Sequence, residues 1–486
     1  MRILTKALIA MAAFTLMNAP MAFGQDAAAT LGAATRAMGV GSVTSVEYEG
    51  TGSSYNFGQA INVASPWRHM ILKKYVADID YATPAMREEM NRTLMDGSMP
   101  FAGFQQTQAI SGKDAWNVTV TAPEGAAAPA TVLERQLLIW LTPIGFLKAA
   151  AAGHATVRTQ GANKIVTFKT DDGHKIEGTI DAQNLIVKTE TWIDNPVLGD
   201  MPIVTTFANY SAFSGIKFPT KIVQTEGGYP VLELAVSAVK PNGAAAFATP
   251  ASVRGATGPA IQVKTQKIGD GVWFLVIGGY NSVLVEFKDY LVMVEAPMDD
   301  GHSIALLAEA KRLVPGKPVK YVVNSHNHFD HLGGVRGFAA EGVTIIVPAA
   351  NVAYYQKVML LPHTMNPDKL SLSGKRAVFE GVQTKRVLTD GAQTLELYDV
   401  PLKTHSDGMI IAYLPKDKIL VEGDAYNPMP LNAPPGAKPD AYFLPFTLDF
   451  YDTVRRLKLD VGPIAPLHGR MSTWDEMTKM IGKPAQ

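Results

Sequence analysis

The residues with the clearest chemical potential lie in one short run, residues 324–334, directly after an apolar segment. Four side chains that can bind metal ions occur there within six residues: His326, His328, Asp330 and His331. Imidazole and carboxylate groups are suitable ligands for zinc and similar divalent ions. A tight loop at the end of a strand can direct neighbouring side chains to different positions. We therefore expect His326 and His328 to share one ion, and Asp330 and His331 to face another.

The composition excludes several other kinds of chemistry. The chain has 486 residues and no cysteine, so thiol nucleophiles and thiolate ligands are excluded. Lys plus Arg and Asp plus Glu both number 44, so no overall field favours a polyanion and we expect no nucleic-acid partner. Hydrophobic residues make up 47% and charged residues 18%, which is typical of a globular protein. The length favours two domains.

The run HxHxDH resembles the signature of the metallo-β-lactamase superfamily, and the resemblance continues to the end of the chain. Later positions match the family in the expected order. The resemblance implies that His405 completes the first metal site and that Asp424 bridges both metals. It also implies that His468 belongs to the second site, together with Asp330 and His331.

This resemblance implies both a fold and an activity. The implied fold class is α/β, an αββα sandwich, and the expected cofactors are two zinc ions or alternatively iron or manganese. Two such ions share a water and present hydroxide to a small-molecule substrate, so the expected protein is a binuclear zinc hydrolase. The substrates implied are esters, thioesters, lactones, lactams or phosphodiesters. We favour the carbonyl substrates because the chain lacks the basic stripes of a nuclease. With Asp424 present and cysteine absent, the ligand set looks more like glyoxalase II and the lactonases than like β-lactamases.

One position departs from the family pattern. An aspartate commonly braces the ligand loop from the end of the preceding strand, and here that place holds Glu295. Glu295 can substitute by reaching further, or it can be an ordinary strand-end carboxylate. Asp299 or Asp300 could alternatively supply the hydrogen bond that orients a ligand histidine.

The remaining site candidates are a catalytic pair and two substrate contacts. Asp330 is expected to act in catalysis as well as in metal binding. Tyr426, two residues after Asp424, could donate to an oxyanion or could simply pack in the core. His363 and Asn432 are candidate substrate-binding residues, Asn432 within a proline-rich stretch, residues 428–439, that could form a pocket lip or a plain connector.

The elements that must position these residues alternate between strands and helices after residue 265. Residues 271–287 and 290–294 have the character of buried strands, and residues 303–314 have helical spacing. A further buried strand is predicted at residues 319–323, directly before the histidine-rich run. This order is typical of α/β organisation.

The preceding part of the chain is different. Residues 25–243 are mostly strand-like runs separated by turn signals, which predicts a mainly antiparallel β domain. One segment, residues 132–151, is predicted to be helical, although Pro143 should break or kink it. This part faintly resembles the periplasmic lipoprotein-carrier proteins. Residues 244–265 are rich in Ala, Gly, Pro and Thr and are interpreted as a linker, so the second domain covers residues 266–486.

Residues 1–24 have the order of a cleavable secretory signal: Arg2 and Lys6, an apolar run, and then small residues. We therefore expect a periplasmic or secreted protein without a transmembrane segment in its mature form. Two other functions stay open. One is a periplasmic ligand-binding protein with a vestigial metal domain, and the other is an iron-dependent dioxygenase of the same superfamily. No feature of the sequence indicates an oligomeric state.

Overall fold

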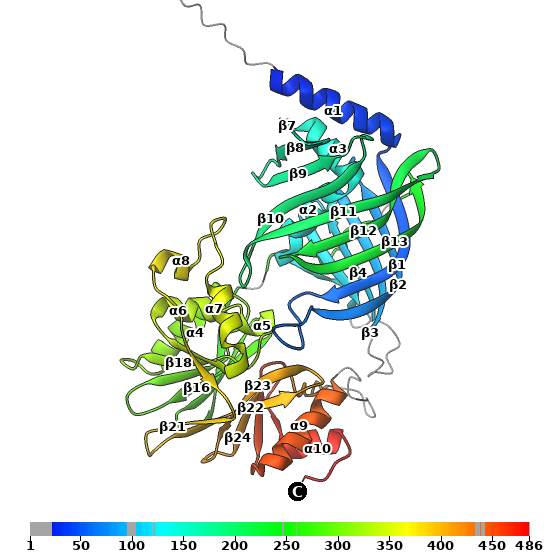
Figure 1. Ribbon diagram of the computed structural model, residues 1–486. Helices are drawn as coiled ribbons and strands as arrows, with labels where there is room; N and C mark the ends of the chain where they lie inside the picture. The colour runs from blue at the N-terminus through cyan, green and yellow to red at the C-terminus, as the bar shows by residue number, and fades with distance from the viewer. Residues whose placement is uncertain are drawn as a thin grey trace, which may run out of the picture.

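The computed structural model describes residues 22–94, 104–119, 122–244, 247–258, 260–432, 438 and 443–485. The predicted signal segment, residues 1–24, lies outside the described residues except for the start of helix α1 (Ala22–Met38). Within the described ranges, no helix combines the length and the apolar character that crossing a membrane requires. The chain forms an upper and a lower half in Figure 1, here called the N-terminal half (22–244) and the C-terminal half (263–485).

The N-terminal half is built on one thirteen-stranded sheet. All neighbouring strands are antiparallel, in the order β6-β5-β4-β3-β2-β1-β13-β12-β11-β10-β9-β8-β7. The strands are β1 (Ser45–Asn56), β2 (Arg68–Asp80), β3 (Ala85–Leu94), β4 (Phe104–Ser111), β5 (Asp114–Thr119), β6 (Ala122–Ala127), β7 (Thr156–Gln160), β8 (Asn163–Lys169), β9 (Lys175–Ile180), β10 (Ile186–Asn195), β11 (Gly199–Phe213), β12 (Ile216–Glu226) and β13 (Tyr229–Pro241). The prediction of a mainly antiparallel N-terminal half is confirmed.

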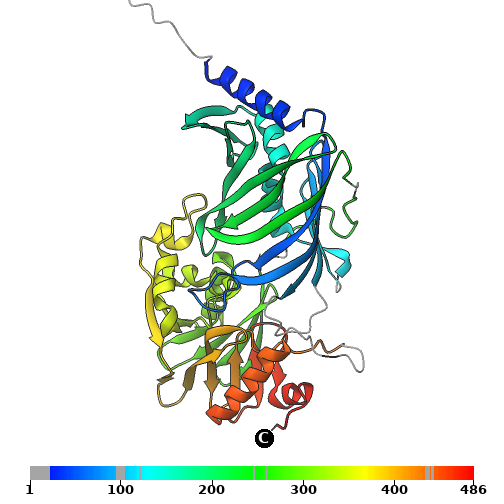
Figure 2. The ribbon, with the colours of Figure 1, turned by 45° about the vertical axis from the view of Figure 1, so that its right-hand side comes forward.

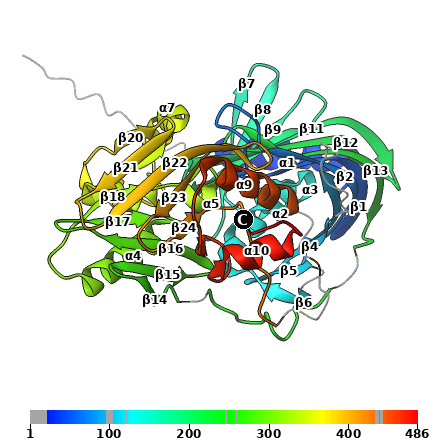
Figure 3. The same ribbon diagram turned by 90° about the horizontal axis from the view of Figure 1, so that it is seen from below.

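The sheet curves around two helices, α2 (Val132–Leu141) and α3 (Pro143–Ala152), which follow the short η1 (Pro129–Thr131). Figure 3 shows strands on three sides of α2 and α3. The predicted helix is thus two helices, because Thr142 is extended and Pro143 begins a new one, with Thr142 Oγ1 accepting from Gly145 N at 3.1 Å. Buried side chains of both helices, such as Leu137 and Phe146, join the core that lines the inner face of the sheet.

The N-terminal half also contains an open cavity of about 370 Å³ between the sheet and α2. Its lining includes the carboxyl groups of Glu88, Glu134 and Glu226, and Glu226 is buried. Burial together with nearby Glu134 raises the pKa of Glu226 to about 8. Glu226 therefore keeps its proton at neutral pH, which avoids an unpaired buried charge.

The C-terminal half contains two sheets. The first has the order β14-β15-β16-β17-β18-β19-β20 and the second the order β21-β22-β23-β24-β25-β26. The strands are β14 (Val263–Gly269), β15 (Val272–Ile277), β16 (Tyr280–Glu286), β17 (Leu291–Val294), β18 (Val319–Val323), β19 (Thr344–Pro348), β20 (Val378–Val382), β21 (Lys385–Thr389), β22 (Thr394–Leu402), β23 (Ser406–Leu414), β24 (Ile419–Glu422), β25 (Pro463–Pro466) and β26 (Ser472–Thr473). The segment predicted at residues 271–287 is a hairpin of β15 and β16 around Gly278 and Gly279, both with positive φ.

Helices lie on both sheets of this half. They are α4 (Asp300–Leu313), α5 (Phe329–Leu332), α6 (Val335–Glu341), η2 (Ala349–Asn351), α7 (Val352–Met359), α8 (Lys369–Ser373), α9 (Leu444–Leu457) and α10 (Trp474–Met480). One core cluster joins the two sheets to each other, a second joins the first sheet to α4, α6 and α7, and a third joins the second sheet to α9 and α10. The strand predicted before the histidine-rich run is β18, and its bounds agree with the prediction.

The two halves meet at several places, among them two segments that connect strands of the N-terminal half. The segment between β1 and β2, residues 57–67, reaches into the C-terminal half beside α5 (Figures 1 and 2). The turn between β10 and β11 meets the segment after α7, where Asp200 N donates to Pro362 O at 2.8 Å. Val197 of this turn is buried in the core cluster of the first sheet and its helices.

Candidate metal centre

Each predicted ligand follows the end of a strand or begins a short helix. His326 and His328 lie between β18 and α5, and Asp330 and His331 lie within α5. The other three come from the second sheet: His405 precedes β23, Asp424 follows β24 and His468 follows β25. Side chains separated by more than a hundred residues in sequence thus meet at the edges of the two sheets.

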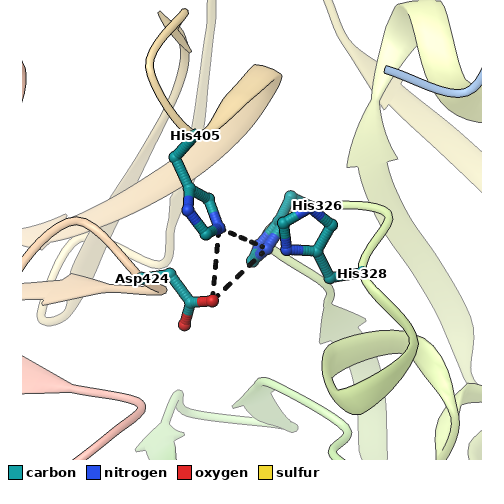
Figure 4. A group of neighbouring side chains, drawn as sticks. All are labelled: His326, His328, His405 and Asp424. Atoms are coloured by element: carbon teal, nitrogen blue, oxygen red, sulfur yellow. Dashed lines mark hydrogen bonds and ion pairs between the residues drawn. The ribbon is translucent and has the colours of Figure 1, made fainter. Parts of the chain in front are cut away.

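A first group comprises His326, His328, His405 and Asp424, all buried (Figure 4). One possible ligand atom from each residue lies within 4.8 Å of those of the others, and together they could hold a metal ion. Nε2 of His405 lies 3.3 Å from Nε2 of His326 and 3.2 Å from Oδ2 of Asp424. Oδ2 of Asp424 lies 3.8 Å from Nε2 of His326.

A second group comprises Asp330, His331, Asp424 and His468. Oδ1 of Asp424 lies 2.9 Å from Nε2 of His331 and 3.0 Å from Nε2 of His468. Oδ2 of Asp330 lies 3.7 Å and 3.5 Å from the same two nitrogens. Asp424 is thus common to both groups, with one carboxylate oxygen facing each.

The two groups differ in the protons they carry. Burial lowers the pKa of His326 and His328 well below the ordinary value, so both are neutral at neutral pH. Burial alone would raise the pKa of Asp424, but His331 and His468 hold it well below its ordinary value. Burial would likewise lower the pKa of His468, but Asp424 and Asp330 raise it to about 9. The second group thus attracts positive charge, which a cation could supply.

The hydrogen bonding of His328 also indicates that the first group is suited to a divalent cation. Nδ1 of the buried His328 has no hydrogen-bond partner among the residues that the structure describes, while its Nε2 lies 3.1 Å from Ala60 O. A carbonyl oxygen can only accept, so Nε2 carries the proton and Nδ1 presents a lone pair. An imidazole with one nitrogen held by a carbonyl and the other free is the usual state of a metal-binding histidine.

Buried polar residues form hydrogen bonds with residues 325–331, the loop and short helix that carry four of the predicted ligands. Oε1 of Glu295 accepts from Ser325 N at 2.9 Å, and Oε2 lies 3.6 Å from Nδ1 of His331. Ser325 Oγ lies 2.9 Å from Nδ1 of His326. Asn324 Nδ2 donates to His331 O at 2.9 Å. The structure therefore places Glu295 beneath the loop, where the sequence suggested a bracing carboxylate.

The alternatives Asp299 and Asp300 lie elsewhere. Asp299 caps α4 and bonds to His302, with Oδ1 2.7 Å from Nδ1. Oδ2 of Asp300 accepts from Lys369 N at 2.9 Å. Neither carboxylate belongs to the two candidate groups or the bonds beneath them in the described part of the chain.

The other predicted site residues are Tyr426, His363 and Asn432. Among the residues that the structure describes, His363 belongs to neither group of possible metal ligands. Tyr426 is buried in the core between the second sheet, α9 and α10, and its hydroxyl lies 2.9 Å from Ser472 Oγ, which favours the packing alternative. His363 is buried at the interface of the two halves, with Nδ1 3.7 Å from Asp194 Oδ1. Asn432 is exposed, and most of the proline-rich stretch after it lies outside the described residues.

Sequence reasoning missed three residues near these groups. The ring of Tyr280 lies 5.0 Å from that of His468, and burial together with Asp330 and Asp424 raises the pKa of Tyr280 to about 12. Asn281 Nδ2 donates to Pro466 O and Gly469 O, on either side of His468. Gln59 Nε2 donates to Asp330 Oδ1 at 2.9 Å. The glycine pair before Tyr280 was the one local signal, since it marks a tight turn.

Known proteins are similar to the C-terminal half of the chain. Residues 276–485 match the model of the family described as the metallo-beta-lactamase superfamily. Similar solved structures include a metallo-beta-lactamase from Pontibacter korlensis, 21% identical, covering 46% of this chain and 98% of that chain with a TM-score of 0.33. The metallo-beta-lactamase FIM-1 from Pseudomonas aeruginosa in its mono-zinc form is 20% identical and covers 46% of this chain and 96% of that chain, with a TM-score of 0.32. A metallo-beta-lactamase from Hirschia baltica is 19% identical and covers 46% of this chain and 99% of that chain, with a TM-score of 0.33.

Proposed function

We propose that the protein is a binuclear zinc hydrolase of small carbonyl compounds. Residues 276–485 match the model of the metallo-beta-lactamase superfamily, and this match is consistent with a metal-dependent hydrolase. The observation that carries the proposal is the position of Asp424, whose Oδ2 faces His405 while Oδ1 faces His331 and His468. A carboxylate shared in this way is suited to hold two cations close together.

The proposed ligand roles follow from the two groups. His326, His328 and His405 would hold the first ion. Asp330, His331 and His468 would hold the second, and Asp424 would bridge the two. When bound, two zinc ions would supply an activated water and would polarise the substrate carbonyl.

The chain's own groups would control protons and orientation around the ions. Burial would raise the pKa of Asp330, but His331 and His468 lower it, so Asp330 is ionised at neutral pH and can accept a hydrogen bond from a reactant. Tyr280 keeps its proton at neutral pH, as an ordinary tyrosine does, and burial raises its pKa further to about 12. We therefore propose Tyr280, in place of Tyr426, as the tyrosine able to donate a proton or hydrogen bond next to His468.

The substrate class proposed is an ester, thioester, lactone or lactam. Support comes from the equal numbers of acidic and basic residues, which give no overall field that would attract a nucleic-acid substrate. For the same domain we propose the αββα layer order, supported by the core clusters that join the sheets to each other and to helices on their outer faces. We also propose domain boundaries at residues 243 and 266 and export of the protein, both supported by sequence patterns alone.

The test is a hydrolysis screen of the zinc-loaded full chain across lactams, lactones, thioesters, esters and phosphodiesters. Asp330→Ala should lower kcat/KM by roughly two orders of magnitude on any carbonyl substrate turned over. Asp452→Ala, a matched change of an exposed carboxylate on α9, should leave it unchanged. Equal activity of Asp330→Ala and wild type would refute the site.

Metal content separates the alternatives. Two zinc ions per chain would support the hydrolase, and one iron per chain would favour the dioxygenase. A purified chain that binds neither metal would favour the ligand-binding protein with a vestigial metal domain. Manganese in place of zinc would change the cofactor but would leave the ligand roles intact.

A further inference from the structure

We infer that the N-terminal half supplies part of the metal centre: the segment between β1 and β2, residues 57–67, fixes the metal-binding atoms of His328 and Asp330. We call this segment the β1–β2 loop. The inference rests on the proposed function, because it assigns the loop a role toward the proposed zinc ions. It makes residues of the N-terminal half positioning residues for ligands of the C-terminal half.

The first contact is made by the backbone of Ala60. Its carbonyl oxygen lies 3.1 Å from His328 Nε2 and accepts from Asn327 Nδ2 at 3.0 Å. A neutral imidazole carries one proton, so donation from Nε2 leaves Nδ1 unprotonated. The loop thereby selects the tautomer of His328 in which Nδ1 is available to a cation.

The second contact is made by the side chain of Gln59. Its Nε2 donates to Oδ1 of Asp330 at 2.9 Å. Oδ2 of Asp330 is left facing His331 and His468. The loop thus holds one carboxylate oxygen of Asp330, while the other oxygen faces the second group. This contact reduces the conformational freedom of the Asp330 side chain before a metal ion binds.

The loop is itself held close to the segments that carry the ligands. Phe329 N donates to Gly58 O at 3.3 Å, and Phe57 and Trp67 pack edge-on against the Phe329 ring. On the other side, Asp407 N donates to Ile61 O at 2.8 Å, next to His405. The loop therefore contacts both the segment around His328 and the segment around His405.

Gly58 makes this close approach possible. Its φ is +72°, and a Cβ added there would lie 2.6 Å from Cγ of Phe329. A side chain at this position would push the loop away from Phe329, and with it the Ala60 carbonyl. Gly161, in the β7–β8 turn, offers a matched comparison because its φ is +62° and nothing lies within 4 Å of an added Cβ.

The experiment compares zinc binding by four full-length variants with that of the wild type. Gly58→Ala is paired with Gly161→Ala, which imposes similar backbone strain without the clash. Gln59→Ala is paired with Asn366→Ala, which removes another bond between the halves, from Asn366 Nδ2 to Asp194 Oδ2 at 3.0 Å. Zinc affinity at each site is measured by competition with a chromogenic chelator, and Co²⁺ substitution reports each site by its visible spectrum.

We expect Gln59→Ala to weaken the second zinc site about 10- to 100-fold and to leave the first site unchanged. We expect Gly58→Ala to weaken the first site by a similar factor and to alter its Co²⁺ spectrum. Both controls should bind zinc as the wild type does. Circular dichroism of the metal-free variants checks their folding, and Gln59→Ala keeps the test decisive if Gly58→Ala does not fold.

Failure of the inference about the β1–β2 loop can be distinguished from failure of the proposed metal centre. If the wild type binds two zinc ions and both loop variants bind them equally well, the inference is overturned while the proposed function stands. The same holds if Asn366→Ala weakens binding as much as Gln59→Ala, because general contact between the halves would then account for the effect. If the wild type binds no zinc, the metal centre and the inference both fail.

Discussion

Oδ1 of Asp424 lies 2.9 Å from Nε2 of His331, although the two residues come from different sheets of the C-terminal half. His331 lies in α5, which follows β18 of the first sheet, and Asp424 follows β24 of the second sheet. The other oxygen of Asp424 faces His405. This one carboxylate therefore joins the two candidate groups, and the effects of replacing it should differ from those of replacing any other ligand.

Asp424→Ala should abolish tight binding of both metals, whereas Asp330→Ala should abolish only the second. The physical reason is that Asp424 contributes an oxygen to each group and Asp330 to one. Metal content after dialysis against a weak chelator, measured by mass spectrometry, checks this. Asp452→Ala should retain two ions. Loss of a single ion in Asp424→Ala would contradict the bridging role.

Glu295→Gln should weaken the second site about 10- to 100-fold while the first site is unaffected. Glutamine keeps an acceptor for Ser325 N but loses the charge that faces His331 Nδ1. Zinc titration resolves the two sites. The matched control is Glu341→Gln, which neutralises an exposed carboxylate at the end of α6. If both sites weakened equally, Glu295 would act through the loop as a whole.

Acid should remove the second metal before the first. In the metal-free protein the pKa of His468 is about 9, and Asp424 and Asp330 also raise that of His331, so binding at the second site must displace protons at neutral pH. Its apparent affinity should rise about tenfold per released proton for each pH unit up to about 9. The pKa values of His326 and His328 are lowered, so the first site needs no such release at neutral pH. Calorimetric titration in buffers of different ionisation enthalpy measures the protons released. Equal proton release at both sites would contradict the assignment.

Glu226→Gln should flatten the dependence of stability on pH. The pKa of Glu226 rises from 4.5 in the unfolded chain to about 8 in the folded protein. Between these values the folded state keeps a proton that the unfolded state has lost, so the free energy of unfolding falls as pH rises, by at most roughly 1.4 kcal/mol per pH unit. The stabilising contribution is complete below pH 4.5 and is lost above about 8. Glutamine does not titrate and should remove the part of this slope that Glu226 contributes. The pKa values of Glu88 and Glu134 are also raised by burial, so their part of the slope should remain.

Urea unfolding in a chelating buffer at several pH values measures the effect of Glu226→Gln. Glu124→Gln, at an exposed position on β6, should leave the slope as in the wild type. A variant whose slope matches that of the wild type would show that Glu226 is ionised in the folded protein.

The sequence predicted the residues that meet at the sheet edges in two ways. The types and spacing of His326, His328, Asp330 and His331 after an apolar strand, β18, are a local signal, whereas His405, Asp424 and His468 were predicted through the family resemblance. The contact between Gln59 and Asp330 has no such signal in the sequence. The two residues are 271 positions apart, and no sequence motif includes both of them. Tyr426 shows the opposite case, because its position near Asp424 in sequence did not determine which way its ring would point.

The pairing of β1 with β13 places the first and last strands of the N-terminal sheet side by side at its centre. Such distant pairings form slowly as a chain folds. Until β13 arrives, one long edge of β1 presents unpaired backbone groups that can recruit a strand from another chain. A chain that ends before residue 229 lacks β13 and should therefore aggregate rather than fold partially. Correct folding of the full chain requires that β1 does not pair with a strand of another chain before β13 has been synthesised.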